Sequence, residues 1–295
     1  MDLFINNQFY IFKKYLQKGA FGMTLLYEKE NEYYAIKFFY PKNMDNKNFL
    51  NEKNILEILK KNVGCLEYLI CFIDAFYITE NQNIYDNIYN MMSEYTGSIN
   101  KKAINAIITQ YIDGQDLFDY FEINNLSEKD FFNFILFMFK CLKTLESLHI
   151  AHRDIKLENI IRKNNGDYVL IDFGLSCTSD NNGVVGTETY VPYWYTALND
   201  KYIDYVYQDV YGFMTCLYIL LNGQYPYENK IYLISNSRNK FLDEYVNHLF
   251  ENKLFYLDSI ESYFLELLIK YNYTNIIKIY NENFNSDKKI YCNIL

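Results

Sequence analysis

The sequence predicts an α+β fold of two lobes, a small β-rich lobe followed by a larger and mainly helical lobe. Short runs of apolar and aromatic residues, separated by turn-forming or charged residues, fill most of 9–112. Helix-like periodicity dominates 113–295. The chain has 295 residues, 50% of them hydrophobic, which is enough to bury the core of each lobe. We therefore expect one domain over 9–295, divided near 112–114.

The β-rich lobe is predicted from strand-like runs around one helix. We expect strands at 9–19, 23–30 and 33–40, a helix at 45–61, and strands within 66–78 and 104–112. In the helical stretch, Phe49, Ile55 and Leu59 are spaced for one buried face. The polar segment 79–101 has no clear period, and we interpret it as a loop insertion.

The helical lobe is predicted from three periodic stretches, at 127–149, 208–222 and 240–280. The most apolar part, 131–139, is too short to span a membrane, and Lys140 interrupts its continuation. We interpret it as a buried amphipathic helix and expect no membrane partner.

Charge and cysteine usage limit the function classes further. The net charge of −9 disfavours a surface for nucleic-acid phosphates. The six cysteines form no Cys-x-x-Cys pair, so we expect reduced, buried or incidental thiols. The N-terminal residues lack a basic region and a small-residue cleavage site, which argues against a secretory signal. Together these features predict a cytoplasmic protein.

A polar cluster follows the apolar helix. Residues 151–160 read AHRDIKLENI, with three charged groups and an amide within six positions: Asp154, Lys156, Glu158 and Asn159. Such a cluster at the end of a buried helix is either a solvated cap or a site. The segment HRDIKLEN matches the pattern H-R-D-L-x-x-x-N of a phosphoryl-transfer loop, with Ile155 in place of Leu.

Further motifs stand in order along the chain. They are YAIK at 34–37, Glu52 in the expected helix, DFG at 172–174, GTETYVP at 186–192 and Asp209 in a helical stretch. In this order and spacing the chain resembles eukaryotic-type protein kinases over nearly its whole length. The resemblance implies the bilobal protein-kinase fold, with Asp209 bracing the loop that holds HRD. The Asn-, Ile-, Tyr- and Lys-rich composition is compatible with a large DNA virus or an AT-rich protist as the source, and a viral kinase would act in the host cytoplasm or the virion.

The resemblance implies an ATP and Mg²⁺ site. Lys37 would hold the α- and β-phosphates, oriented by an ion pair with Glu52. Asp172 and Asn159 would hold Mg²⁺ ions that bridge phosphate oxygens. Phosphoryl transfer asks the protein for positioning and charge stabilisation, and these residue types supply both.

The resemblance also implies catalytic roles in the HRD loop. Asp154 would accept or orient the proton of the substrate hydroxyl, and Lys156 would offset charge on the γ-phosphoryl group. Lys156 and Thr187 resemble the serine/threonine branch, which implies a protein substrate with a Ser or Thr hydroxyl. Asp116 and Glu158 would attract basic residues upstream of that hydroxyl.

The remaining nucleotide contacts are assigned by the same resemblance. The glycine loop reads QKGAFGMT, so its second and third glycines are present while Gln17 replaces the first. Thr109 corresponds to the gatekeeper. The positions expected at the nucleotide are Leu16, Gly19, Gly22, Thr24, Ala35, Lys37, Glu52, Thr109, Gln110, Ile112, Asp116 and Ile161.

Departures from the family pattern leave alternatives open. Tyr193 replaces the Glu of the APE motif, and Gly183 occupies the usual phosphorylation site. The activation segment would then be constitutively active, with Asp180 as a partial anion substitute, or be phosphorylated at Thr178 or Ser179. The main alternative function is a pseudokinase that binds nucleotide or partners without turnover. A small-molecule kinase is a second one, disfavoured by the GTETY segment that would hold a peptide.

Overall fold

The computed structural model describes residues 1–40, 47–80, 82, 84–93, 103–124, 126–178, 185–191 and 205–222. The chain forms two compact units. Unit 1 comprises residues 1–113 and 171–177, and unit 2 comprises residues 114–170 and 178–295. The helix expected at 240–280 lies outside the described residues. The strand-rich first part and the helices of the second agree with the predicted α+β class.

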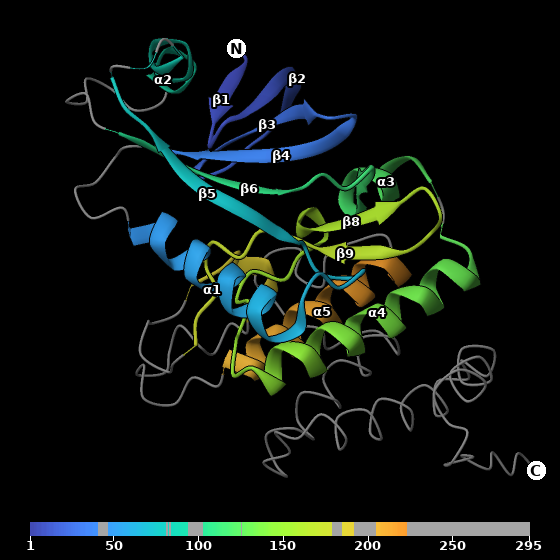
Figure 1. Ribbon diagram of the computed structural model, residues 1–295. Helices are drawn as coiled ribbons and strands as arrows, with labels where there is room; N and C mark the ends of the chain where they lie inside the picture. The colour runs from blue at the N-terminus through green and yellow to red at the C-terminus, as the bar shows by residue number, and fades with distance from the viewer. Residues whose placement is uncertain are drawn as a thin grey trace, which may run out of the picture. The chain divides into compact units, whose positions relative to one another are not determined.

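Unit 1 is built on a six-stranded sheet in which every neighbouring pair is antiparallel, in the order β1-β2-β3-β4-β6-β5 (Figure 1). Its strands are β1 (Leu3–Ile5), β2 (Gln8–Lys18), β3 (Gly22–Lys29), β4 (Glu32–Phe39), β5 (Phe72–Ile78) and β6 (Ile104–Gln110). The predicted strands are confirmed. Strand β1 was not predicted, since it precedes the first strand-like run.

Helix α1 (Lys47–Val63) confirms the predicted helix and its face. Phe49, Ile55 and Leu59 are buried, together with Glu52. The helix contacts β5 and β6. It thereby carries a buried carboxylate to the sheet, which places Glu52 for the site described below.

The expectation of a loop over 79–101 is wrong in part, because Tyr85–Ser93 forms helix α2. Tyr85, Ile88 and Met92 are buried in the same hydrophobic cluster as residues of β1, β2, β3, β4, β5 and β6. In Figure 1 the helix lies beside the N-terminal end of the chain, away from α1. The face of the sheet that carries Leu25 and Phe38 needs an apolar cover, and α2 contributes to it. The polar residues between its apolar positions hid the helical period.

Unit 2 contains three α-helices among its described residues: α3 (Leu117–Ile123), α4 (Glu128–Ser147) and α5 (Tyr205–Asn222). A small antiparallel sheet consists of β7 (Gly114–Asp116), β8 (Ile160–Lys163) and β9 (Tyr168–Leu170). Two 3₁₀ turns are present: η1 (Leu157–Asn159) lies within the HRDIKLEN segment, and η2 (Glu188–Tyr190) follows Thr187. The helices predicted at 127–149 and 208–222 are confirmed by α4 and α5.

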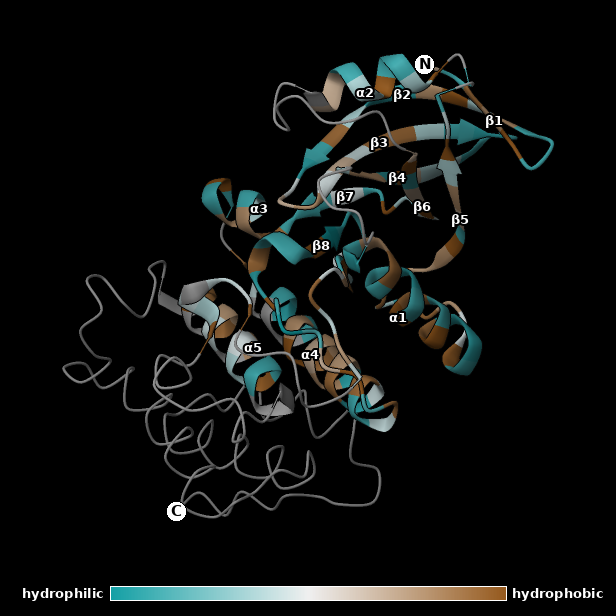
Figure 2. Ribbon diagram, turned by 90° about the vertical axis from the view of Figure 1, so that its left-hand side faces the viewer, coloured by the Kyte–Doolittle hydropathy of each residue, from teal (hydrophilic) through white to brown (hydrophobic). Residues whose placement is uncertain are grey.

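Helix α4 is fixed at its start and along its apolar face. Ser127 and Asp130 form a capping box at the N-terminus, in which the Ser127 hydroxyl accepts from the amide of Asp130. Phe134 packs edge-on against Tyr168 of β9 and Phe213 of α5. Figure 2 shows hydrophobic stretches on α4 and α5 where the two helices lie side by side. This packing supports the loop that follows α4. Within the described part of the chain, no helix has the length and apolarity needed to cross a membrane.

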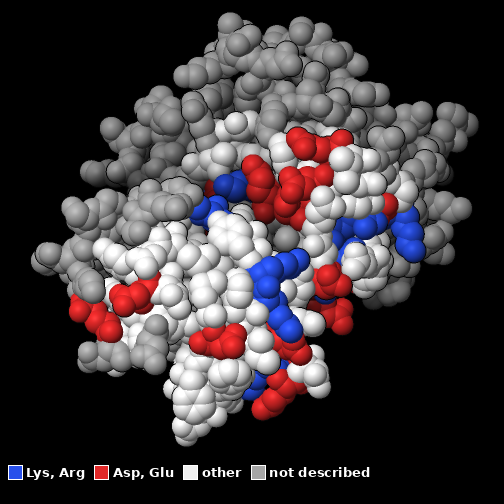
Figure 3. All heavy atoms as spheres, turned by 90° about the horizontal axis from the view of Figure 1, so that it is seen from above, with Lys and Arg blue, Asp and Glu red and all other residues white. Residues whose placement is uncertain are grey.

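Charged side chains of both signs are interspersed on the face shown in Figure 3. Lys13 and Glu28 form an ion pair, and their side chains are 36% and 20% exposed. On this face, the acidic surplus of the chain is therefore not gathered into one field of a single sign.

The expectation of reduced thiols throughout is wrong for Cys65 and Cys71, which form a disulfide. The turn after α1 brings their Cα atoms to 5.0 Å, although six positions separate them. The spacing of these two cysteines in the sequence did not predict the disulfide, because a backbone turn brings them together. Cys141, Cys177 and Cys216 are buried thiols outside any disulfide.

Candidate active site

Unit 1 contains a cluster of three charged side chains, two of which are largely buried. Lys37 of β4 extends its ammonium between Glu52 of α1 and Asp172, and its Nζ lies 2.7 Å from Glu52 Oε2 and 2.7 Å from Asp172 Oδ1. The three side chains are 16%, 6% and 37% exposed in that order. The fold thus brings together residues that are 15 and 135 positions apart.

Burial and the neighbouring charges shift the pKa values of Lys37 and Glu52 in opposite directions. Burial by itself lowers the pKa of Lys37, but the carboxylates of Asp172 and Glu52 outweigh it and hold that pKa above its ordinary value. Burial raises the pKa of Glu52 to about 7, against the lowering effect of Lys37. Lys37 therefore stays charged, while Glu52 changes its charge near neutral pH.

Asn51 holds the segment after Asp172 in place, a role that the sequence did not reveal. Its side-chain amide donates to the carbonyl of Ser176 at 2.8 Å and to that of Gly174 at 3.4 Å. Asp172 itself has a φ of 60°, a left-handed conformation that is strained for a residue other than glycine. Strain of this kind persists where surrounding contacts impose it, and Asn51 provides two of them.

Gly19 and Gly22 of the β2–β3 hairpin differ in the space that a Cβ atom would find. A Cβ on Gly22 would overlap the backbone carbonyl of Phe38 in β4, so close strand packing requires a glycine there. A Cβ on Gly19 would meet nothing nearer than the Gly22 carbonyl oxygen at 4.0 Å. Open space beside Gly19 is what a closely approaching phosphate needs.

The other positions expected at the nucleotide are distributed between the two units. In unit 1, Thr24 lies opposite Lys37 in the β3–β4 register, and Ala35 lies opposite Thr109. Leu16 lies in β2, Gln110 ends β6, and Ile112 follows it. In unit 2, Asp116 lies opposite Ile161 in the β7–β8 register.

Asp116 also has a structural role. Its carboxylate accepts from the amide of Asp119 at 2.9 Å and caps the N-terminus of α3. Burial raises its pKa, and the negative charges of Asp119 and Glu158 add to that shift. Asp116 and Glu158, both in unit 2, are thus close enough for their charges to interact.

The loop after α4 is anchored from α5. The carboxylate of Asp209 accepts from the amides of His152 at 2.6 Å and Arg153 at 2.7 Å. This confirms the bracing role that the resemblance implied. Arg153 has a φ of 64° and is 6% exposed, so the loop is held in a strained conformation.

Asp154 is the centre of a hydrogen-bond network in unit 2. Its Oδ1 accepts from the hydroxyl and the amide of Thr187, at 2.9 and 3.1 Å. Its Oδ2 accepts from the side-chain amide of Asn159 at 3.0 Å and lies 3.1 Å from Lys156 Nζ. Lys156 also donates to the Thr187 hydroxyl at 3.0 Å. A carboxylate accepts about four hydrogen bonds, so this one is fully satisfied.

Gln208 was missed by the sequence reading, since its partners are distant in the chain. Its side-chain amide donates to the carbonyl of Arg153 at 3.0 Å and to that of Val185 at 2.7 Å. Gly186 follows Val185, with a φ of 116° and no room for a Cβ beside the Arg153 carbonyl. These contacts join the segment that carries Thr187 to the HRD loop.

The donor set is compatible with Mg²⁺ and phosphate. Mg²⁺ is typically held by one or two protein groups together with substrate phosphates. Among the described residues no group of three or more His, Cys, Asp or Glu side chains is arranged to hold a metal alone. Asp172 offers a carboxylate, and Asn159 offers its amide oxygen, because its nitrogen donates to Asp154.

Several positions singled out in the sequence lie outside the described residues: Ser179, Asp180, Gly183 and Tyr193. Thr178 is described and exposed.

Comparisons with known proteins identify the family of this chain. The family model described as "Protein kinase domain" matches residues 10–278. The probable serine/threonine-protein kinase PknB of Bifidobacterium longum is 29% identical over 154 residues, covering 49% of this chain and 22% of that protein. The serine/threonine-protein kinase max-2 of Caenorhabditis elegans is 31% identical over 176 residues, covering 50% of this chain and 26% of that protein.

The probable serine/threonine protein kinase IRE4 of Arabidopsis thaliana is 29% identical over 170 residues, covering 55% of this chain and 14% of that protein. The matched segments thus span less than a third of the length of each of these relatives. The family model, in contrast, covers most of the chain. The chain therefore belongs to the protein kinase domain family.

Proposed function

We propose that this chain transfers the γ-phosphoryl group of Mg-ATP to a Ser or Thr hydroxyl of a protein. The observation that carries the proposal is the arrangement of Asp154, Thr187 and Lys156. A carboxylate, a hydroxyl and an ammonium lie within 3.1 Å of one another, which is hydrogen-bond reach for proton transfer.

Asp154 is the proposed base. All its accepting positions are taken by Thr187, Asn159 and Lys156, so an incoming hydroxyl has to replace one donor. The Thr187 hydroxyl, 2.9 Å from Oδ1, shows that a hydroxyl can lie within hydrogen-bond reach of this carboxylate. Lys156 would then offset negative charge on the group being transferred.

We propose that the nucleotide is held by the residues that the resemblance assigns to it. Lys37 would hold the phosphates, with Glu52 fixing its position, and Asp172 and Asn159 would hold Mg²⁺. Bound Mg²⁺ neutralises charge on the phosphate oxygens. Gly19 would let the backbone approach the phosphates, and the adenine and ribose would meet the positions from Leu16 to Ile161 that the resemblance assigns.

The proposed substrate is a protein with a Ser or Thr acceptor. The names of the relatives support this, as does the contact between Lys156 and Thr187, a pairing typical of the serine/threonine branch. The carboxylates of Asp116 and Glu158 would favour peptides with basic residues upstream of the hydroxyl.

A pseudokinase remains the second candidate, because Gln17 replaces the first glycine of the loop. In the structure Gln17 pairs with Thr24 within the β2–β3 ladder. A side chain at that position lowers the freedom of the loop to approach phosphate. Such a protein would bind Mg-ATP without turnover.

The experiment that tests the proposal is transfer of labelled γ-phosphate from Mg-ATP to mixed protein substrates, for the wild type and Asp154→Asn. We expect label on Ser and Thr, and a rate lower by about 10²–10⁴-fold in the variant, as for loss of a general base. Thermal stabilisation by Mg-ATP should persist in both proteins. Wild-type stabilisation without transfer would establish the pseudokinase instead. Equal transfer by both proteins would remove Asp154 from the chemistry.

A further inference from the structure

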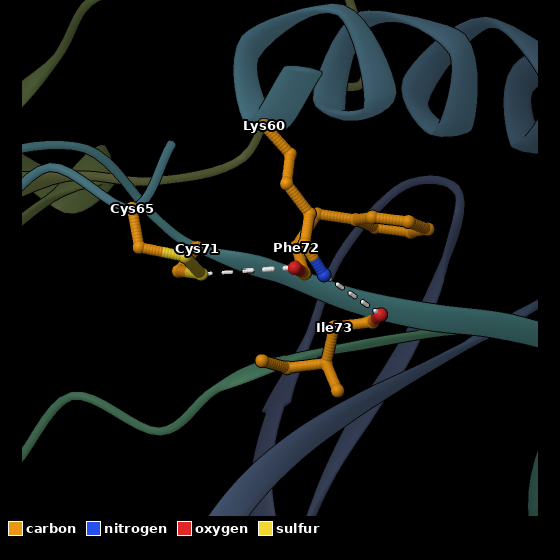
Figure 4. The surroundings of a disulfide bond; sticks show 5 residues. All are labelled: Lys60, Cys65, Cys71, Phe72 and Ile73. Atoms are coloured by element: carbon orange, nitrogen blue, oxygen red, sulfur yellow. Dashed lines mark hydrogen bonds between the residues drawn. A yellow bond between two sulfur atoms is a disulfide. The ribbon is translucent and has the colours of Figure 1, made fainter. Parts of the chain in front are cut away.

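The disulfide between Cys65 and Cys71 closes the connection from α1 to β5 (Figure 4). The Cα separation of 5.0 Å lies within the range that a disulfide spans without backbone movement. Cys65 is exposed, whereas Cys71 is only 5% exposed. A reagent from solvent therefore reaches this disulfide from the side of Cys65.

A pocket of about 800 Å³ lies against the disulfide, and both cysteines belong to its wall. Unit 1 forms it alone, with the tyrosines 33, 34 and 111 and the charged side chains of Lys13, Glu32 and Asp113 among its lining residues. Sites for small molecules have volumes of about 300–1,000 Å³. Of the positions expected at the nucleotide, Gln110 lines this pocket, but Leu16, Thr24 and Ala35 do not. The pocket thus shares Gln110 with the expected adenine site but not these three positions.

The surroundings of Cys71 are suited to a free thiol as well as to a disulfide. Cys71 Sγ lies 3.6 Å from the carbonyl oxygen of Phe72 (Figure 4). A disulfide sulfur has no hydrogen to donate, but a thiol can donate to this oxygen. Opening the bond therefore gives the buried sulfur a hydrogen-bond acceptor at once.

The start of β5 is also held independently of the disulfide. Lys60 of α1 donates to the carbonyl of Ile73 at 3.2 Å and lies over the ring of Phe72, 5.6 Å from its centroid (Figure 4). The carbonyl of Cys71 accepts from the amide of Gln110 at 3.0 Å. These contacts keep α1, β5 and β6 together when the disulfide opens.

We propose that this pocket binds a low-molecular-weight peptide thiol of the glutathione type, which exchanges with the disulfide at Cys65. The thiolate of the ligand attacks Cys65 Sγ, the bond to Cys71 breaks, and a mixed disulfide forms at Cys65. Cys71 leaves as a thiolate and takes up one proton, so the step consumes no external oxidant or reductant.

Lys13, which is paired with Glu28 in the structure, would exchange this partner for a carboxylate of the ligand. Glu32, which accepts from the Tyr34 hydroxyl, and Asp113 would face the ammonium group of the ligand. The proposal does not depend on kinase activity.

The experiment uses the full chain, purified without reductant. Free thiols are first blocked by alkylation, and peptide mass spectrometry then identifies a Cys65–Cys71 crosslink. Incubation with reduced glutathione, followed by a second alkylation, should give one glutathione on Cys65 and an alkyl group on Cys71. Alkylation of both cysteines before any reduction would overturn the proposal, as would glutathione found on Cys71.

Two matched variants separate binding in the pocket from simple reduction. Lys13→Gln should form the adduct severalfold more slowly with glutathione, while its reaction with uncharged 2-mercaptoethanol stays unchanged. Lys14→Gln, the same charge change at an exposed neighbour that does not line the pocket, should match the wild type with both thiols. Equal glutathione rates for all three proteins would show that the pocket does not select the thiol.

Discussion

The hydroxyl of Thr187 donates a hydrogen bond of 2.9 Å to Oδ1 of Asp154, across 33 positions of sequence. The amide of Thr187 donates to the same oxygen at 3.1 Å. One residue of the segment after Gly186 therefore orients the carboxylate that we propose as the base. If this segment moves, Asp154 loses both hydrogen bonds together. The orientation of the Asp154 carboxylate in the HRD loop therefore depends on where the segment lies.

Removal of the Thr187 hydroxyl should slow transfer without affecting nucleotide binding. Thr187→Val has nearly the same shape but loses the hydrogen bonds to Asp154 and from Lys156. A hydrogen bond to a charged group is worth about 1.5–3 kcal/mol, so we expect kcat to fall by about tenfold or more. Thr187→Ser keeps the hydroxyl and should retain most of the activity. Steady-state kinetics of the three proteins checks this, and a fully active Thr187→Val would contradict it.

The pH dependence of stability should depend on Glu52. Its pKa is raised from an ordinary 4.5 to about 7, mainly by burial, so between these values the folded state binds more protons than the unfolded state. Stability linked to this group therefore falls as the pH rises through that window. Glu52→Gln does not titrate. We expect the melting temperature of the wild type to fall relative to this variant between pH 4.5 and about 7. If the difference between the two melting temperatures is the same at every pH in this range, Glu52 does not titrate there.

The two glycines of the hairpin should respond differently to alanine. Gly22→Ala forces a Cβ against the Phe38 carbonyl and should cost about 1–3 kcal/mol in the free energy of unfolding, as for other overpacked sites. Gly19→Ala meets open space, and the loss of backbone freedom in the unfolded chain should leave stability unchanged or raised by up to about 1 kcal/mol. Urea unfolding of both variants measures the difference. Equal losses would mean that the hairpin packs differently from this structure.

Asp209 should be important for stability as well as for the loop geometry. Asp209→Ala leaves the amides of His152 and Arg153 without this acceptor, and each unsatisfied buried group costs about 1–3 kcal/mol. Asp209→Asn keeps one accepting oxygen and should cost less. Glu122→Ala, an exposed acidic position in α3, should change the free energy of unfolding by less than about 0.5 kcal/mol. If urea unfolding gives the same loss in free energy of unfolding for Asp209→Ala as for Glu122→Ala, the bracing role is contradicted.

Much of the fold was predictable because local patterns of residues in the sequence determine it. Alternating and aromatic runs indicated β2, β3 and β4, and helical spacing indicated α1, α4 and α5. Helix α2 was missed, because its polar residues mask the apolar positions 85, 88 and 92 and only the uncovered sheet face reveals their purpose. The disulfide was missed for a similar reason, since a turn and not a spacing brings Cys65 to Cys71.

The sequence by itself determined the family resemblance and the identity of the chemical groups, because motifs such as HRDIKLEN and DFG keep a fixed order along the chain. The tertiary structure alone decided how those groups are held. The contact of Lys37 with Asp172, the bonds of Asn51 to the carbonyls of Gly174 and Ser176, and the contact of Thr187 with Asp154 each join residues more than 30 positions apart. Periodicity reports only neighbours within a few residues, whereas hydrogen bonds and ion pairs depend on distances that the packed core sets.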